Sequence, residues 1–155
     1  MDVQLFKGIQ IKSSTVGLIG NGGSASVASH SAIDLINVVG IAALTFHEAA
    51  MITCQSNDYG YENSFSNSVS KFLKRDDCLI AISSSGQSKN IVNASKAALN
   101  ANAKLITFSG FLDTNPLRRL GHLNFWVNQQ DYGMVEIAHQ FLLHNATDHF
   151  LETNQ

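Results

Sequence analysis

Short apolar runs alternate with stretches of helical spacing along most of the chain. The apolar runs are brief, as buried strands are, and they cover residues 16–19, 41–46, 79–82, 104–108 and 123–127. The helical patterns cover residues 25–36, 47–57, 62–73, 89–100 and 134–151. Strands that alternate with helices predict a parallel sheet with both faces covered. We therefore expect an α/β fold with a doubly wound sheet.

The remaining stretches are less regular. Residues 1–14 carry only a weak apolar stripe. Residues 57–61 (Asn-Asp-Tyr-Gly-Tyr) predict a turn, and residues 110–121, which include the only proline, predict a loop. The sequence contains no recognisable linker or internal repeat, so we expect a single domain over residues 1–155.

Composition narrows the class of protein. Hydrophobic residues make up 45% of the chain and charged residues only 14%, which favours a globular protein that packs against copies of itself. The net charge of -2 provides no basic surface, so nucleic acid is not an expected partner. No apolar run reaches the length of a membrane span and no signal peptide opens the chain, which predicts a cytoplasmic protein without a membrane partner. Cys54 and Cys78 lack metal-type spacing and are expected to be small buried hydrophobes.

Two loops rich in glycine and serine each follow a predicted strand and precede a predicted helix. They cover residues 20–24 (Gly-Asn-Gly-Gly-Ser) and 83–88 (Ser-Ser-Ser-Gly-Gln-Ser). Backbone N–H groups at a helix N-terminus attract anions, and serine hydroxyls add hydrogen bonds. Either loop alone is equally compatible with serines that only cap a helix. In a flavodoxin-like sheet, however, both loops lie at the switch point between the first and third strands, and this pairing predicts a phosphate site.

The first loop also fits the G-x-G-x-x-A dinucleotide fingerprint over residues 20–25, with Glu48 as a candidate for binding the ribose. That interpretation leaves the second loop unexplained, and residues 46–48 do not have the pattern of a strand end. We therefore expect no nucleotide cofactor.

Three motifs together give the chain a family likeness: residues 20–25, residues 57–61, and residues 82–90 (Ile-Ser-Ser-Ser-Gly-Gln-Ser-Lys-Asn). In this order they resemble the sugar isomerase (SIS) domain and, more narrowly, the phosphoheptose isomerases, over about residues 16–148. The resemblance implies a three-layer, five-stranded, flavodoxin-like SIS domain with a phosphosugar in the crevice. The implied substrate-binding residues are Asn21, Gly22, Ser24, Asp58, Ser83, Ser84, Ser85 and Ser88. Without the resemblance, Asp58 is as readily explained as an Asx-turn residue.

The resemblance also implies the chemistry, which is isomerisation of sedoheptulose 7-phosphate through an enediol(ate), with one zinc or similar divalent ion. Such a reaction needs groups that move protons and stabilise the enediolate. His30 and Asp34 share a helix face by their i, i+4 spacing, and with Glu136 and His144 they match the family's metal-binding positions. Asp34 and His144 also match its proton-transfer residues. The remaining histidines are expected to be structural or surface residues: His47, His122, His139 and His149.

The chain departs from the family at several positions. Asp34 is one methylene shorter than the family's Glu, Glu136 replaces a Gln, and Val38 replaces an Arg near the substrate. Glu136 and His144 are eight residues apart, about 12 Å along a helix axis, so one ion reaches both only if their side chains are extended. The segment 1–14 is shorter than the N-terminal helix with which the family builds a tetramer. We expect a homo-oligomer, a dimer or tetramer, and keep a non-catalytic SIS module that binds a phosphosugar or a protein as the alternative.

Overall fold

The computed structural model describes residues 14–154, so the apolar stripe expected over residues 1–14 lies almost wholly outside the described residues. A sheet of five parallel strands forms the middle layer, in the order β2-β1-β3-β4-β5. The strands are β1 (Val16–Ile19), β2 (Ala43–Thr45), β3 (Cys78–Ser83), β4 (Lys104–Ser109) and β5 (Leu123–Trp126). This is the expected flavodoxin-like order, with the switch point between β1 and β3.

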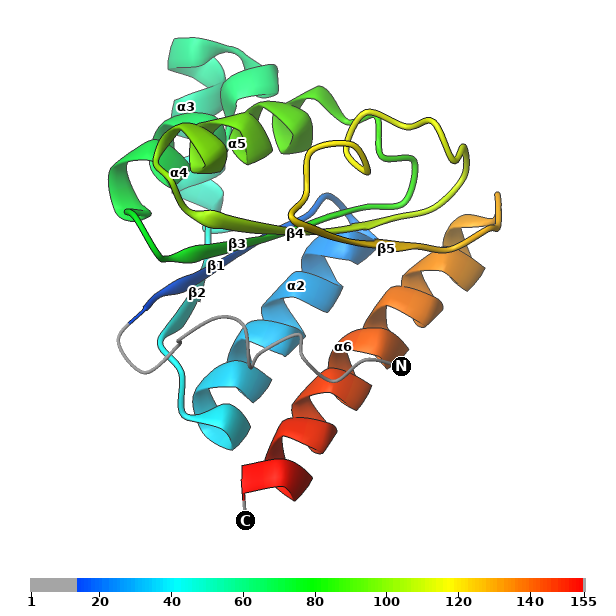
Figure 1. Ribbon diagram of the computed structural model, residues 1–155. Coiled ribbons are helices and arrows are strands. Elements are labelled where there is room, and N and C mark those ends of the chain that lie inside the picture. The colour runs from blue at the N-terminus through cyan, green and yellow to red at the C-terminus, as the bar shows by residue number, and fades with distance from the viewer. Residues whose placement is uncertain (1–13, 155) are drawn as a thin grey trace.

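Helices cover both faces of the sheet, which makes three layers (Figure 1). One face carries α2 (Gly23–Asp34), its π-helical continuation η2 (Leu35–Val39) and α6 (Tyr132–Asn154). The opposite face carries α3 (Ala49–Tyr59), the 3-10 turn η3 (Tyr61–Asn63), α4 (Ser66–Phe72) and α5 (Lys89–Asn100). None of the helices that the structure describes is both long and apolar enough to cross a membrane. The prediction of a doubly wound α/β fold is confirmed.

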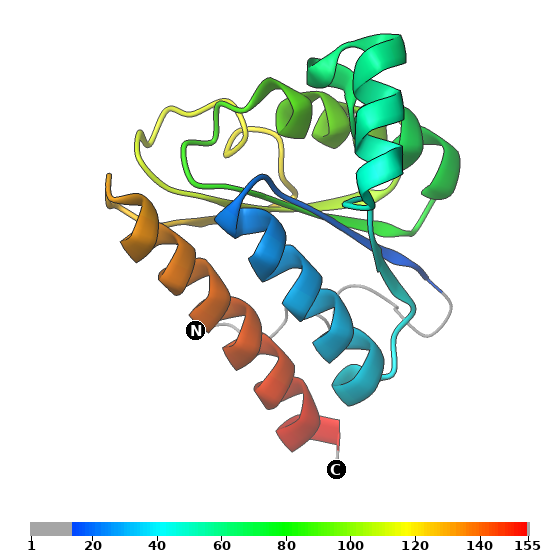
Figure 2. The same cartoon turned by 180° about the vertical axis from the view of Figure 1, so that it is seen from behind.

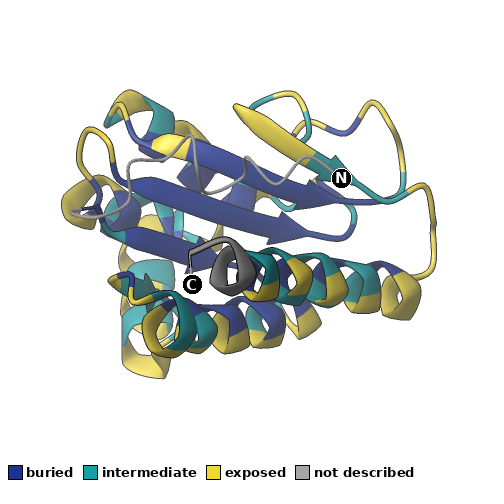
Figure 3. Cartoon of the chain, turned by 60° about the horizontal axis from the view of Figure 1, so that its bottom comes forward, coloured by how far each residue is buried: buried dark blue, intermediate teal, exposed yellow. Residues whose placement is uncertain are grey.

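The two faces of the central strands bury separate apolar clusters. In β3, Ile80 and Ile82 face the layer of α2 and α6, whereas Leu79 and Ala81 face the layer of α4 and α5. Every residue of β3 is buried, and the edge strand β5 begins with exposed residues (Figure 3). A strand covered on both faces has no polar alternation, which is why a short continuous apolar run identifies it in the sequence.

Three predicted elements differ from the structure. The strand expected over 41–46 is only Ala43–Thr45, at the sheet edge where β2 pairs with β1 alone. The helix expected over 62–73 is divided into η3 and α4. The turn expected over 57–61 lies further along the chain, because α3 continues to Tyr59 and ends at Gly60 with a φ of +80°. Glycine adopts such a left-handed φ without steric cost, so the chain reverses at this residue.

Only one of the two cysteines is a buried hydrophobe. Cys78 opens β3 in the core, and burial raises the pKa of its thiol to about 12. Cys54 is exposed, so the expectation of burial is wrong for this residue. The physical reason is that α3 buries none of its residues against the sheet.

His139 ties α6 to the sheet beside the carboxyl end of β4. Its side chain is fully buried, and its Nε2–H donates to the carbonyl oxygen of Ser109 at 3.2 Å. The ring also packs edge-on against Phe108. Burial lowers the pKa of His139 to about 4, and the bond to Ser109 only partly opposes this shift. His139 is therefore neutral at physiological pH and has the structural role expected from the sequence.

We predict that acid destabilises the protein through His139. The unfolded histidine takes up a proton near pH 6.5 but the folded one only near pH 4, so the free energy of unfolding falls as the pH is lowered between these values. The loss from this residue reaches about 3 kcal/mol at pH 4. In urea titrations at a series of pH values, His139→Gln removes most of this slope and His30→Gln, at an exposed histidine, retains it. An unchanged slope in His139→Gln contradicts the prediction.

Candidate functional site

A cavity of about 310 Å³ opens at the carboxyl ends of the neighbouring strands β1 and β3. Its walls come from the two loops rich in glycine and serine and from the start of α6. Seven of the eight predicted substrate-binding residues line it: Asn21, Gly22, Ser24, Ser83, Ser84, Ser85 and Ser88. Tyr132 and Glu136 of α6 also line the cavity, a position that the sequence did not predict for either.

The serine hydroxyls of the second loop are turned away from the helix that they precede. Ser88 is the N-cap residue of α5, yet its side chain makes no capping bond and its Oγ accepts from the Ser83 hydroxyl at 3.3 Å. Ser85 Oγ accepts from the backbone N–H of Gln87 at 3.2 Å. Ser84 Oγ is buried and has no hydrogen-bond partner among the described residues. Capping of α5 therefore does not explain these hydroxyls, and an anion site stays the prediction for this loop.

The second loop is supported from behind by the long loop 110–121. Gly86 has a φ of +64°, and a Cβ built there would overlap the side chain of Asn115. Asn115 is itself buried and donates to the carbonyl oxygen of Gly110 at 3.2 Å. The N–H of Leu117 donates to the carbonyl oxygen of Gly86 at 3.1 Å. Both the backbone conformation and the lack of space require glycine at this turn.

The helices that follow the two loops direct their N-termini at the cavity. α2 begins after Gly22, whose φ is +55° and which, as a glycine, has no side chain with which to cap the helix. The Glu136 carboxylate stands against this turn, since a Cβ built at Gly23 would overlap it. Two helix N-termini give the cavity a positive potential, which a phosphate or the Glu136 carboxylate complements.

A reciprocal pair of amides joins the two loops across the switch point. Asn21 Nδ2 donates to Asn90 Oδ1 at 2.9 Å, and Asn90 Nδ2 donates to Asn21 Oδ1 at 2.9 Å. Tyr61 adds a bond from its hydroxyl to Asn21 Oδ1 at 3.2 Å, and Asn90 Oδ1 also accepts from the Ile91 N–H at 3.0 Å. The sequence did not single out Asn90, although it lies inside the motif over residues 82–90. The role of Asn90 becomes visible only in the structure, where its side chain is buried between the two loops.

The residues that follow β2 support the first loop from the side. His47 Nε2 accepts from the Gly20 N–H at 3.2 Å, and its Nδ1 lies 3.2 Å from Ser29 Oγ. Desolvation lowers the pKa of His47, so the ring is neutral and structural, as expected. Glu48, which the dinucleotide interpretation needs for a ribose, instead caps α3 by accepting from the Met51 N–H at 2.9 Å. Backbone N–H groups at this cap lower the pKa of the Glu48 carboxyl.

Asp58 is the predicted substrate-binding residue that the cavity lining does not include. It lies exposed on α3, where Asn57 Nδ2 donates to its carboxylate at 2.9 Å and Cys54 Sγ lies 3.5 Å away. Its place within a helix excludes the Asx-turn explanation. Substrate binding by Asp58 stays a prediction, and Tyr61 is the residue through which this motif contacts the cavity wall.

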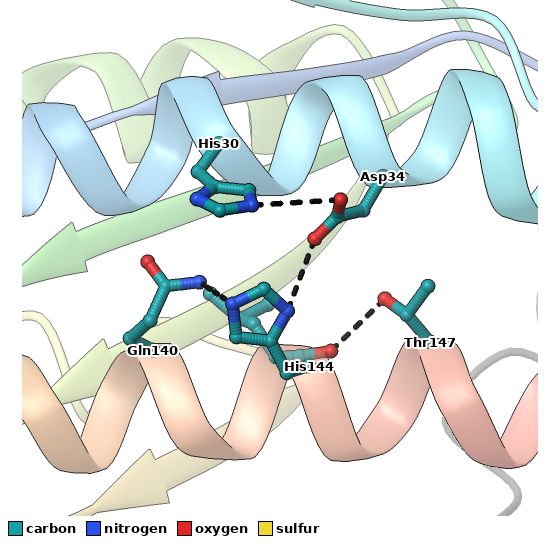
Figure 4. Close-up of polar contacts among 6 residues, drawn as sticks. His30, Asp34, Gln140, His144 and Thr147 are labelled. Atoms are coloured by element: carbon teal, nitrogen blue, oxygen red, sulfur yellow. Dashed lines mark hydrogen bonds and ion pairs between the residues drawn. The ribbon is translucent and has the colours of Figure 1, made fainter.

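A second cluster of polar side chains lies further along α2 and α6 (Figure 4). His144 Nδ1 is 3.1 Å from one carboxylate oxygen of Asp34, and His30 Nε2 is 3.7 Å from the other. The rings of His30 and His144 meet edge-on, with their centroids 4.8 Å apart. On the far side of His144, Gln140 Nε2 lies 2.6 Å from the ring Nε2. Gln140 was not predicted from the sequence, although its i, i+4 spacing to His144 indicates that the two side chains share a helix face.

The structure brings together three of the four predicted metal-binding residues. One ligand atom each from His30, Asp34 and His144 lies within 4.8 Å of the others. Imidazole nitrogens and a carboxylate oxygen are ligands that zinc takes, so this donor set fits the ion that the resemblance implies. Glu136 is not brought into the group, because it lies two helical turns away in the lining of the cavity.

The cavity and the cluster lie along one pair of helices. α2 and α6 both begin at the cavity and run side by side away from it (Figures 1 and 2). His30 lies seven positions after Gly23, which is about 10 Å along α2. Val38, where the resemblance places an Arg, is half-buried in η2 beyond the cluster. The arrangement places the cavity at one end of this helix pair and the cluster of His30, Asp34 and His144 further along it.

Known proteins are similar to this chain in both sequence and fold. The SIS domain family matches residues 8–110. The phosphoheptose isomerase of Helicobacter pylori (strain Shi470) is 32% identical over 147 residues, which are 88% of this chain and 76% of that protein. The phosphoheptose isomerase of Aliarcobacter butzleri (strain RM4018) is 34% identical over 135 residues, which are 82% of this chain and 70% of that protein.

A solved structure extends the likeness to three dimensions. Phosphoheptose isomerase GmhA from Neisseria gonorrhoeae superposes with a TM-score of 0.88 and 26% sequence identity, over 96% of this chain and 82% of that chain. The match therefore includes the sheet, both helical layers and the loops that form the cavity. The chain belongs to the SIS domain family, in which phosphoheptose isomerases are its relatives.

Proposed function

We propose that this protein is a phosphosugar isomerase of the phosphoheptose type, which interconverts sedoheptulose 7-phosphate and an aldose 7-phosphate through an enediol(ate). The observation that carries the proposal is that α2 and α6 connect a cavity lined by serines and helix N-termini to the Asp34–His144 pair further along. The reacting carbons of this sugar lie at the opposite end of its chain from the phosphate. An extended phosphosugar therefore suits a binding site and an acid–base pair that are separated in this way.

The phosphate binds in the cavity in this proposal. The N-termini of α2 and α5 attract its charge, and the hydroxyls of Ser84, Ser85 and Ser88 donate to its oxygens. The Ser84 hydroxyl is buried without a partner in the described residues, so a hydrogen bond to a phosphate oxygen removes the free-energy penalty of an unpaired buried hydroxyl. Asn21 and Ser24, on the opposite wall, bind sugar hydroxyls.

Proton transfer falls to Asp34 and His144. The Asp34 carboxylate takes a proton from the carbon beside the carbonyl group and returns it to the neighbouring carbon, while His144 moves the hydroxyl protons. The 3.1 Å contact between His144 Nδ1 and the Asp34 carboxylate orients the two groups toward each other. Asp34 is shorter than the Glu of the resemblance, so the substrate has to come closer to α2.

Zinc is the ion that we propose for His30, Asp34 and His144. When bound, it polarises the substrate oxygens and stabilises the enediolate as a Lewis acid. His30 and Asp34 lie one turn apart on α2, and His144 approaches them from α6. Two of the three ligands are therefore fixed on one rigid element.

A non-catalytic module that binds a phosphosugar is the second candidate. Two departures from the resemblance favour it. Val38 supplies no positive charge near the substrate, and the shorter Asp34 carboxylate stands further from it. Such a module is stabilised by a phosphosugar but does not convert it.

We also propose that the protein is a homo-oligomer, a dimer or tetramer, as the resemblance implies. Apolar side chains at three- and four-residue spacing line the outer side of α6: Met134, Ile137 and Phe141 are 57%, 68% and 62% exposed. A second copy of the chain is the occupant that we propose for this stripe, because burying such a surface is the main driving force for association.

Ser84→Ala is predicted to weaken the binding of sedoheptulose 7-phosphate at least about tenfold, since a hydrogen bond to a charged group contributes roughly 1.5–3 kcal/mol. Without ligand the Ser84 hydroxyl has no partner among the described residues, so we expect the same substitution to leave the free energy of unfolding unchanged or higher. Calorimetry measures the affinity, and urea unfolding measures the stability. Ser70→Ala, at an exposed serine, is the matched control and changes neither. Unaltered affinity in Ser84→Ala would remove this serine from the phosphate site.

Asp34→Asn and His144→Gln are each predicted to lower kcat by about 10²–10⁴-fold, the usual contribution of a positioned acid or base. The affinity for the phosphosugar changes far less, because the cavity is intact. The assay follows aldose formation from sedoheptulose 7-phosphate with and without added zinc. Asp113→Asn, at an exposed carboxylate in the loop 110–121, is the control and keeps full turnover. If the unsubstituted protein binds the sugar but forms no aldose under either condition, the isomerase proposal fails and the non-catalytic module stands.

Ile137→Asp is predicted to shift the protein toward the monomer in analytical ultracentrifugation, because it places a charge in the proposed contact. The side chain is exposed in the single chain, so the substitution does not disturb the fold. Tyr59→Asp, at an exposed tyrosine of α3 in the opposite helical layer, is the control and leaves the sedimentation coefficient unchanged. A monomeric unsubstituted protein, or an oligomer indifferent to Ile137→Asp, refutes the proposed surface.

A further inference from the structure

Gln140 contacts the His144 ring from the side opposite Asp34 (Figure 4). Gln140 Nε2 lies 2.6 Å from His144 Nε2, while His144 Nδ1 lies 3.1 Å from the Asp34 carboxylate. Gln140 precedes His144 by one turn of α6, and both side chains are partly buried. The ring is therefore held at both of its nitrogens, by an amide of its own helix and by a carboxylate of α2.

This contact determines which nitrogen of His144 faces the cluster. With Nε2 engaged by Gln140, Nδ1 is turned toward Asp34 and the other ligand atoms of the group. A histidine that binds a metal ion generally has its second nitrogen held by a hydrogen bond, which fixes the orientation of the ring. Gln140 supplies that bond here.

An amide suits this position because it carries a donor and an acceptor at one end. In the arrangement observed, the Gln140 N–H donates to the Nε2 lone pair, so the ring proton is on Nδ1 and faces the Asp34 carboxylate. A neutral histidine that binds an ion through Nδ1 carries its proton on Nε2 and needs an acceptor there. Rotation of the same amide presents its Oε1 to that proton. Glutamine can therefore form a hydrogen bond to His144 Nε2 both with and without a bound ion.

We propose that Gln140 is the positioning residue for His144 in the metal-binding group of His30, Asp34 and His144. The inference rests on the proposed function for the identity of the ion, whereas the contact itself is independent of it. Glu136 lies one turn earlier on the same helix face but stands at the cavity, against the first turn of α2. The residue of this face that serves the cluster is Gln140.

The test measures binding of Zn²⁺ by titration calorimetry and of Co²⁺ by its visible absorption, using the full chain without substrate. We expect Gln140→Leu and Gln140→Ala to weaken the affinity for both ions by about 10–100-fold. Gln140→Glu retains an acceptor opposite Nε2, so its affinity stays within about threefold of the unsubstituted protein or exceeds it. Asn145→Leu, at an exposed amide of the same helix, is the matched control and also stays within about threefold.

Thermal unfolding without metal establishes that each variant is folded. Two different substitutions remove the amide, so the test can still be made if one of them does not fold. Unchanged affinity in Gln140→Leu and Gln140→Ala overturns the inference. A loss in Asn145→Leu as large as theirs overturns it too, because the effect is then not specific to the His144 contact. Failure of the unsubstituted protein to bind either ion has the same consequence. Turnover is measured in its own assay, so each of these results leaves the isomerase proposal to be decided separately.

Discussion

The reciprocal amide pair of Asn21 and Asn90 is the contact on which the geometry of the cavity depends. α2 and α5 follow adjacent strands but cover opposite faces of the sheet, so packing within either layer does not set the distance between their N-termini. Two hydrogen bonds of 2.9 Å bridge this gap. Asn90 is almost fully buried, so losing the Asn21 amide leaves part of its hydrogen-bonding capacity unmet. The two loops therefore behave as one binding surface.

The parallel course of α2 and α6 imposes the second constraint. Both helices begin at the cavity, so side chains that lie equally far from it along the two helices come into contact. His30 and Asp34 of α2 therefore lie beside Gln140 and His144 of α6. In the proposed function, binding and proton transfer are thus separated along the helix axes. The cavity supplies the positive potential of two helix N-termini, and the cluster lies beyond the first turns, where that potential falls off. Each end of the site is able to change without rebuilding the other.

Much of this fold was predictable because its central strands are buried on both faces. The pattern placed β3 within one residue at each end, and it placed both ends of α5 correctly. The edge strand β2 is different, because its residues are only half-buried and the apolar run over 41–46 extends beyond its hydrogen bonds. The division of residues 62–73 into η3 and α4 depends on how both pack against α5, and local spacing carries no information about that packing.

The site was predictable in its loops and less so on its helices, for a physical reason. Parallel strands end at one edge of a sheet, so motifs that follow strands converge wherever the strands pair. Spacing along a helix identifies only a shared face, and Glu136 and Gln140 share theirs. The neighbouring helix decides between them: Gly23 has no side chain and admits the Glu136 carboxylate to the first turn of α2, while Gln140 lies one turn deeper against His144. A carboxylate is favoured at a helix N-terminus and an amide beside a ring nitrogen, so the replacement of Gln by Glu at position 136 is compatible with an intact cluster.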